Sequence, residues 1–378
     1  MNINRRHFIA GTLGSLLLQS KTFANIQPAN SKKIIVILLR GGLDSLATVA
    51  PTGDPDYKRH RKNSAYKTND WLPLDSFFTL NKNLKESFKL FKNNELMIAH
   101  AVATPYRSRS HFDARDVLES GSLQNRGEGW LNKTIQQLNK INGWNKSGIS
   151  IGHQIPLIMR GKAEVLNVAK DVYKTRDMGT LNTLIDLYSE EAPDLAELLL
   201  NGLEIEVKIN SSMSKNDKNK FRKHKFEANS LAKLMATPGG PDVGCMELAG
   251  FDTHNNENPN NGSLARALSN LDETIITIKS GMGKQWENTT VVAISEFGRT
   301  IKWNGTNGTD HGTASCGFFA GGNIGKSQVI AKWPGLKDKN LYQKRDLLPT
   351  LDLFDINKII LENMLHIDKN SINKNIFS

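Results

Sequence analysis

The sequence predicts an α/β fold: a mostly parallel sheet with helices on both faces, plus a helical insertion. Strand-like apolar runs alternate along the chain with amphipathic helical stretches, which is the pattern of a parallel sheet covered by helices. The run at 33–39 is apolar and β-branched almost throughout and leads to two glycines, as expected of a central strand that opens into a loop. Between about 175 and 238 polar amphipathic helices replace the strand signals, which indicates an inserted helical cap.

Each further element is predicted from its own pattern. Apolar residues at 80, 84, 88 and 91 share one helical face, and an apolar run follows as the next strand. Two later runs have the strand pattern, with helical periodicity between them. The predicted strands are 33–39, 96–101, 243–248 and 290–295, and the predicted helices are 80–91, 181–200, 215–235 and 264–282. No linker or repeat divides residues 25–378, so we expect a single domain.

Residues 1–24 have the pattern of a bacterial export signal. Arg5 and Arg6 lie in a segment that resembles the twin-arginine signature, and an apolar run over 8–18 and a small-residue cleavage site follow. An ordinary secretory signal with an arginine pair, or an uncleaved anchor, is the alternative. The apolar run is too short to cross a bilayer comfortably, so we expect no stable membrane span after cleavage. We expect a periplasmic or extracellular protein, with the twin-arginine translocase as its partner during export. That route carries folded chains and favours a metalloprotein.

Composition argues against two classes of protein. The formal charge is +11, of which three positive charges lie in the signal, leaving +8 on the mature chain. Lysines and arginines are spread without a basic stripe interleaved with aromatics, which argues against nucleic-acid binding and favours anionic surfaces or substrates. Cys245 and Cys316 are the only cysteines, so the chain is no disulfide scaffold. One bridge between them and two buried thiols are equally compatible with the sequence.

Polar, chemically versatile side chains follow the predicted strands. In an open parallel sheet ligands bind beyond the carboxyl ends of the strands, so these segments carry the candidate site. The segments are 40–45, 107–113, 251–254, 295–300 and 309–313. Together they supply carboxylates, imidazoles, a hydroxyl and guanidiniums. Carboxylates and neutral imidazoles bind Zn²⁺ or Mn²⁺, and arginine matches a tetrahedral oxyanion, so the set predicts a metal-dependent hydrolase.

Each segment taken alone also has a structural explanation. Asp44 follows two glycines and suits a turn, and Asp252 with His254 suits a loop cap. Asp310 and His311 lie in a loop rich in Gly, Asn and Thr, which suits a turn as well. Five such segments in the order that one sheet requires favour a shared site.

Six motifs together carry a family resemblance. They are Arg-Gly-Gly-x-Asp-x-Leu at 40–46, Arg-Ser-His-Phe-Asp-Ala at 109–114, Phe-Asp-Thr-His at 251–254, Ser-Glu-Phe-Gly-Arg-Thr at 295–300, Asp-His-Gly at 310–312 and Arg-Asp-Leu-Leu-Pro-Thr at 345–350. Over nearly the whole mature chain, the sequence resembles the exported family catalogued as domain of unknown function 1501. That family is similar to the alkaline phosphatase superfamily of phosphatases, sulfatases and phosphoglycerate mutases. The resemblance implies an alkaline-phosphatase-like core and a nucleophile beside one or two divalent ions of Zn, Mn or Ca.

The resemblance also implies roles on the nucleophile side of the site. Asp44 would bind the nucleophile-side metal, and Ser110 would be the nucleophile with His111 near it. Glu296 lies where the superfamily usually has an aspartate followed by a histidine. Phe297 replaces that histidine, which leaves this metal one ligand short.

On the other side, the resemblance implies a second metal. Asp252 and His254 would be ligands of that metal, although the superfamily more often spaces its acid and histidine further apart. His311, preceded by Asp310, would complete the second site.

Ser110 and the nearby arginines have competing interpretations. Ser110-x-x-Asp113 before a helical pattern is a capping box, in which the hydroxyl accepts a backbone N–H; a cap and a nucleophile can share this place. Ser108 is the alternative nucleophile. Three arginines are candidates to bind the oxyanion, against the alternative of surface salt bridges. They are Arg107, Arg109 and Arg299.

The sequence therefore predicts an exported metal-dependent hydrolase of phosphate or sulfate esters, acting on an anionic ester or polysaccharide. The alternative is a catalytically inactive binding or assembly protein on the same fold, with a structural metal or none, which the missing histidine favours. Residues 320–327 loosely fit a phosphate-loop pattern, but no helical pattern follows them, so we do not expect nucleotide hydrolysis.

Overall fold

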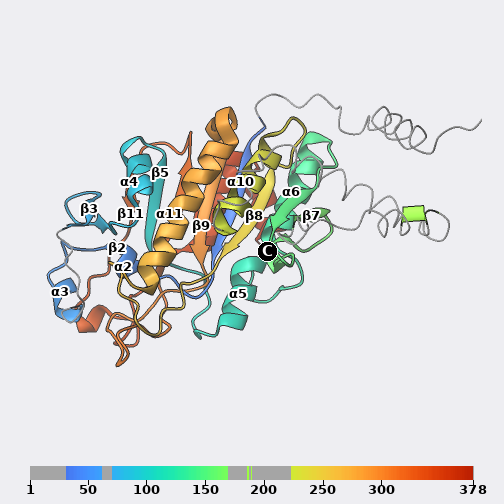
Figure 1. Cartoon of the computed structure of the whole chain (residues 1–378). Helices are drawn as coiled ribbons and strands as arrows, with labels where there is room; N and C mark the ends of the chain where they lie inside the picture. The colour runs from blue at the N-terminus through green and yellow to red at the C-terminus, as the bar shows by residue number, and fades with distance from the viewer. Residues whose placement is uncertain (1–30, 62–69, 169–184, 187–188, 190–222, 378) are drawn as a thin grey trace, which may run out of the picture.

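The computed structural model of the chain describes residues 31–61, 70–168, 185–186, 189 and 223–377. The predicted export signal at 1–24 and most of the predicted insertion lie outside these residues. Within them a nine-stranded sheet forms the centre, in the order β11-β5-β10-β9-β1-β8-β6-β7, with β12 also paired to β5 (Figure 1). β10 runs antiparallel to both of its neighbours, and the other strand pairs of this sheet are parallel. The predicted fold class, a mostly parallel sheet, is confirmed.

The strands of the large sheet are β1 (Lys33–Leu39), β5 (Leu96–Ala103), β6 (Gly148–Ile151), β7 (Val165–Val168), β8 (Val243–Leu248), β9 (Thr289–Ser295), β10 (Ser315–Gly321), β11 (Val329–Ile330) and β12 (Leu351–Asp352). A small second sheet contains β2 (Val49–Ala50), β4 (Thr79–Leu80) and β3 (Leu72–Pro73). The helices are α2 (Ser45–Thr48), α3 (Tyr57–His60), α4 (Lys85–Lys92), α5 (His111–Ser120), α6 (Trp130–Asn142), α10 (Lys223–Ala236), α11 (Ser263–Met282), α12 (Leu353–Leu365) and α13 (Lys369–Ser371).

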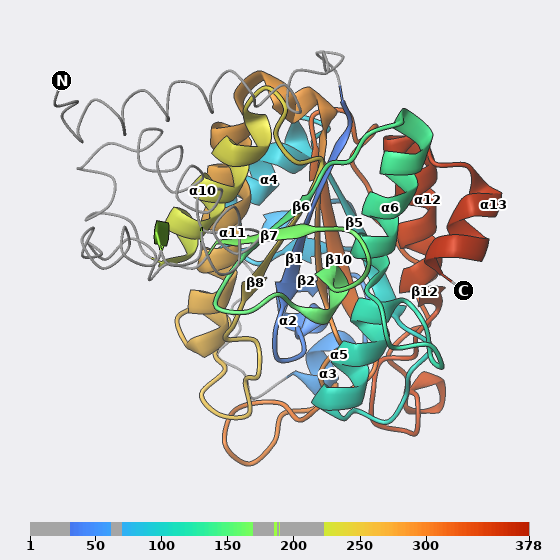
Figure 2. The same ribbon diagram turned by 90° about the vertical axis from the view of Figure 1, so that its right-hand side faces the viewer.

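Helices cover both faces of the sheet, and this explains why β1 is apolar throughout. In the edge-on view α4, α10 and α11 lie on one side and α6, α12 and α13 on the other (Figure 2). Alternate residues of β1 enter the two cores: Ile35, Ile37 and Leu39 one of them, and Ile34, Val36 and Leu38 the other. All six are at most 1% exposed. A strand buried on both faces has no place for a polar side chain, which is the physical origin of the run seen in the sequence.

Strand register brings the candidate segments to one edge. Leu39 at the end of β1 is level with Leu248 of β8 and with Ser295 of β9. β10 runs the other way, and its first residue, Ser315, pairs with Val102 near the end of β5. The loop 296–314 therefore leaves and returns at the same edge where β1, β5 and β8 end. Because β10 begins at this edge, the segment before it, 309–313, joins the other four candidate segments there.

Two of the predicted helices differ from the observed ones. The helix predicted over 80–91 begins only at Lys85, because Leu80 belongs to β4, where it pairs with Val49. The described part of the 215–235 helix, α10, is not part of a cap: it lies beside α11, and its Leu231 and Met235 lie over Gly244 of β8. The helix predicted over 181–200 lies almost entirely outside the described residues.

The two cysteines are free, buried thiols. Cys245 lies on β8 and Cys316 on β10, and β1 and β9 separate these two strands in the sheet. The bridge that the sequence allowed is therefore not formed. Among the described residues, none of the helices combines the length and the apolar character that crossing a membrane requires.

A buried histidine on β5 makes the fold sensitive to acid. The Ala101 N–H donates to His100 Nδ1 at 2.7 Å, so Nε2 carries the proton and faces the Val49 carbonyl at 2.9 Å. Burial disfavours the charged ring and lowers the pKa of His100 from 6.5 to about 4. Because the unfolded chain takes up this proton more readily, the stabilisation is complete above about pH 6.5 and is lost as the pH falls towards 4.

We expect the free energy of unfolding to drop by about 2 kcal/mol from pH 7 to pH 5 through His100 alone. Urea unfolding at the two pH values measures the drop. The His100→Gln variant, which has no titrating group at this position, should lose correspondingly less stability. Equal losses in the two proteins would contradict this role of His100.

Candidate metal centre

Four side chains converge at the carboxyl edge of the sheet. His111 begins α5, Asp252 and His254 follow β8, and His311 precedes β10. His254 Nε2 and His311 Nε2 lie 3.0 Å apart, and each lies 3.1 Å from Asp252 Oδ1. His111 Nε2 lies 3.4 Å from Asp252 Oδ2. Ligand atoms of His111, Asp252 and His311 all fall within 4.8 Å of one another, which is close enough for one ion to contact them.

The far nitrogen of each imidazole, Nδ1, faces an acceptor, which favours a proton on that nitrogen. His111 Nδ1 lies 2.9 Å from Glu296 Oε1, and His311 Nδ1 lies 3.2 Å from the carbonyl oxygen of Arg109. His254 Nδ1 lies 3.5 Å from Asp310 Oδ1. A neutral imidazole whose Nδ1 carries the proton presents a lone pair on Nε2.

Three such lone pairs therefore meet beside the Asp252 carboxylate. His111 Nε2 is buried without a hydrogen-bond partner among the described residues. Crowded acceptor atoms repel one another unless a cation lies among them. Carboxylates and backbone carbonyls that orient metal-binding histidines through their second nitrogen are the usual outer partners of such sites. These residues therefore fit a divalent ion.

Asp252 is kept ionised by a buried arginine. Arg299 Nη1 donates to Asp252 Oδ1 at 2.7 Å and to the Gly41 carbonyl at 3.2 Å, and Arg299 also contacts Thr309. Burial opposes ionisation of Asp252, but the hydrogen bond and charge of Arg299 hold its pKa below the ordinary value. The carboxylate is therefore negative at neutral pH and suited to bind a cation.

Glu296 and Asp310, both predicted as ligands, lie behind the histidines, on the side of their Nδ1 atoms. Glu296 is buried and accepts hydrogen bonds from the Gly41 N–H at 2.9 Å and from Arg115 Nε at 3.3 Å, in addition to His111. Burial opposes its ionisation, but these contacts keep the pKa of Glu296 below the ordinary value. Glu296 and Asp310 orient the histidines instead of joining the four converging side chains.

Asp44 is not brought to this cluster. Arg61 donates to both of its oxygens, at 2.7 and 3.1 Å, and the N–H groups of Leu46 and Ala47 donate to it as it caps α2. Burial opposes ionisation, but the charge of Arg61 holds the pKa of Asp44 below the ordinary value. Beside it, burial and the Asp44 charge raise the pKa of Glu257 well above the ordinary value. The buried arginine already neutralises Asp44.

Phe297 lies where the resemblance places a histidine. Its ring centroid is 4.8 Å from that of His111 and 4.9 Å from that of His311. Phe297 also packs on Gly42, where a Cβ would come within 2.6 Å of the ring. At Gly41, with φ +123°, a Cβ would lie 2.2 Å from the Asp252 nitrogen, so only glycine allows β1 to approach the Asp252 loop this closely.

Ser110 is the N-cap residue of α5, next to His111. Among the described contacts it makes no side-chain capping hydrogen bond, so the predicted capping box does not form. Asp113 instead contacts Tyr106 at 3.2 Å and Arg126 at 3.1 Å. The Ser110 hydroxyl is therefore not engaged as a cap, whereas Ser108 lies exposed two residues earlier.

The three predicted oxyanion arginines are engaged with protein groups. Arg109 pairs with the buried Asp346 at 2.7 Å, Arg107 donates to the carbonyls of Thr104 and Tyr106, and Arg299 holds Asp252. Arg115, which sequence reasoning missed, contacts Glu296, and its side chain is 37% exposed. Its signal in the sequence is the spacing of four residues from His111, which places both side chains on one face of α5.

A model of a protein family described as a protein of unknown function (DUF1501) matches residues 94–358. No curated protein matches the sequence. Among solved structures, the chain is similar to the C-terminal periplasmic domain of EcEptC from Escherichia coli in complex with Zn, at 9% identity and a TM-score of 0.39, covering 79% of this chain and 75% of that one.

Two further solved structures are similar at the same low level. A protein in the alkaline phosphatase superfamily from Vibrio parahaemolyticus has 10% identity and a TM-score of 0.41, covering 90% of this chain and 70% of that one. Alkaline phosphatase from the Antarctic bacterium TAB5 has 9% identity and a TM-score of 0.33, covering 79% and 95%. What the site can do chemically rests on the side chains of this chain.

Proposed function

The chain belongs to the DUF1501 family of proteins of unknown function, and from this premise we propose that it is an exported, metal-dependent hydrolase of phosphate or sulfate esters. The observation that carries the proposal is the convergence of three histidine Nε2 atoms on Asp252, with the Nδ1 atom of each histidine facing an acceptor. With the imidazole protons on Nδ1, such an arrangement is unfavourable without a cation, and it is typical of a metal centre.

Four residues would hold one divalent ion: His111, Asp252, His254 and His311. Three imidazoles and a carboxylate are ligands that suit Zn²⁺, and Mn²⁺ is the second candidate. Two observations favour one ion over two. Arg61 neutralises Asp44, and the apolar Phe297 lies beside the histidines.

In the reaction, Ser110 would be the nucleophile. When bound, the ion would supply Lewis acidity and lower the pKa of a nearby hydroxyl. Ser110 Oγ would bond to phosphorus or sulfur and lose its proton to solvent, while the ester bond breaks and the departing alkoxide takes up a proton from solvent to leave as the alcohol. Water would then release phosphate or sulfate from Ser110. Arg115 would bind the non-bridging oxygens, since its partly exposed guanidinium lies beside Glu296.

Export is part of the proposal. The pattern at 1–24 supports passage through the twin-arginine translocase to the periplasm or the cell exterior. The excess of positive charge supports an anionic ester or polysaccharide as substrate.

The second candidate is a binding or assembly protein that keeps the metal but lacks turnover. The replacement of a histidine by Phe297 favours this candidate. Metal content and turnover together separate the two. A metal-loaded protein that hydrolyses p-nitrophenyl phosphate or sulfate would be the hydrolase, and a metal-loaded protein inert towards both would be the binding protein.

Removal of one imidazole should empty the site. We expect about one equivalent of Zn or Mn in the purified mature protein and under about a tenth of an equivalent in His311→Ala, measured by elemental mass spectrometry. His153→Ala, which removes an exposed histidine elsewhere, is the matched control and should keep the metal. Equal metal content in the parent and in His311→Ala would rule out the site.

A further inference from the structure

An open hollow of about 650 Å³ is lined by residues between 332 and 350. Its lining includes two lysines, two aromatic residues and two amides, and it contains no carboxylate. These six residues are Lys332, Trp333, Lys339, Asn340, Tyr342 and Gln343. Both lysines are exposed, and neither has an ion-pair partner among the described residues. The hollow is therefore cationic and has aromatic walls.

The aromatic wall is held rigidly from behind. The Trp333 indole N–H donates to Asp54 Oδ2 at 2.8 Å, and the ring packs edge-on against Phe78 and His100, with centroids 5.5 and 5.2 Å away. Trp333 is only half-buried, so part of the ring remains available to the hollow. Leu348, another lining residue, is 36% exposed and adds apolar surface.

One wall of the hollow is connected to the site through Arg109. Arg109 Nη2 donates to Gln343 Oε1 at 2.7 Å, and the Arg109 carbonyl accepts from His311 Nδ1 at 3.2 Å. Arg109, Gln343 and Lys344 all have positive φ, at 65°, 51° and 55°. Strained non-glycine backbone of this kind persists where the surroundings enforce it, and it is concentrated at functional sites. Arg109 thus contacts the lining of the hollow and directly precedes Ser110 in the chain.

We propose that this hollow binds one ring of an anionic oligosaccharide whose ester group reaches the metal centre. Aromatic faces take the apolar faces of sugar rings, the amides suit ring hydroxyls, and the lysines suit sulfate or phosphate groups. The proposal rests on the proposed function, because it places the ester to be cleaved at Ser110. The binding step itself needs no metal.

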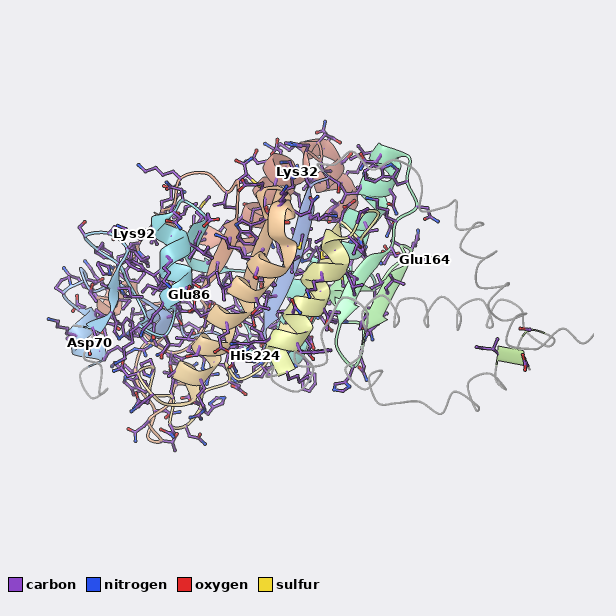
Figure 3. The ribbon with its side chains drawn as sticks, turned by 45° about the horizontal axis from the view of Figure 1, so that its top comes forward. Lys32, Asp70, Glu86, Lys92, Glu164 and His224 are labelled. Carbon is purple, nitrogen blue, oxygen red and sulfur yellow. The ribbon has the colours of Figure 1, made fainter. Side chains whose placement is uncertain are left out.

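The test is calorimetric titration of the full mature protein, stripped of metal with EDTA, with a sulfated galactan hexasaccharide and with its desulfated counterpart. We expect binding of the sulfated form, affinity about tenfold lower in the Lys332→Gln/Lys339→Gln double variant, and a similar loss in Tyr342→Ala. Lys92→Gln is the matched control. Lys92 ends α4 just before β5 begins, at the opposite edge of the sheet, and should leave the affinity unchanged (Figure 3).

The proposal is overturned if the parent does not bind the sulfated hexasaccharide, if the desulfated form binds as tightly, or if the double lysine variant keeps full affinity. A protein that hydrolyses p-nitrophenyl sulfate but does not bind the hexasaccharide would be a hydrolase without this subsite. A protein that binds the hexasaccharide but takes up no metal would keep the subsite and lose the proposed reaction.

Discussion

Ser110→Ala is expected to lower ester hydrolysis about a thousandfold or more while the metal content stays at the parent level. The nucleophile is the group that forms a bond to the ester in the proposed reaction, so its removal costs the whole covalent pathway. Ser110 is not among the converging ligands, so the variant should still bind the ion. Turnover of p-nitrophenyl phosphate and sulfate, measured together with elemental analysis, checks both halves of the prediction.

Ser108→Ala is the matched control, because it removes an identical hydroxyl two residues away, at an exposed position. We expect it to retain the parent rate. A rate loss in Ser108→Ala with an active Ser110→Ala would transfer the nucleophile to Ser108. Equal activity of both variants would leave the reaction without a serine nucleophile.

Arg61→Leu is expected to lower the free energy of unfolding by about 3–5 kcal/mol, the usual cost of leaving a buried charge without its partner. The side chains of Arg61 and Asp44 are each 1% exposed, and Arg61 also donates to the Thr300 carbonyl at 3.1 Å. Without the arginine, Asp44 would face the neighbouring Glu257 with no other positive charge among its described contacts. Urea unfolding at pH 7 measures the effect.

Two further variants isolate the cause. Arg59→Leu removes an arginine two residues away that is 49% exposed and pairs with Asp338 at 3.2 Å, and it should cost at most about 1 kcal/mol. In Arg61→Leu/Asp44→Leu the unpaired charge is gone, and most of the lost stability should return. A double variant as unstable as Arg61→Leu would show that packing of the arginine, not charge, is responsible.

Much of the fold could be predicted because a strand that is buried on both faces is apolar along its whole length. The strand predicted at 33–39 is β1, the helix predicted at 264–282 agrees with α11 within a residue, and the runs at 243–248 and 290–295 are β8 and β9. β10 was not among the predicted strands, and its direction could not be predicted either, since a short apolar run looks the same in either direction. Helical periodicity shows which face of a helix is apolar but not what that face packs against, so it did not reveal that α10 covers the sheet.

The candidate site was located by the rule that polar side chains after strands meet at one edge. That rule selected His111, Asp252, His254 and His311. The rule could not distinguish a carboxylate that would bind the ion from one that orients a histidine. Glu296 orients His111 because of the direction of its side chain, which the sequence does not reveal. Arg61 was missed since it lies in a lysine-rich and arginine-rich stretch that reads as solvent-exposed, 17 residues after the Asp44 it neutralises.

The converging side chains come from positions up to 200 residues apart, in segments that follow β5, β8 and β9. Such contacts form slowly, because loop closure costs entropy before the long-range strand pairs can stabilise the chain. Assembly of the sheet must therefore precede assembly of the ligands. An ion bound at the proposed centre would be acquired by a chain that has already folded, so it would add stability by mass action and would not nucleate the fold.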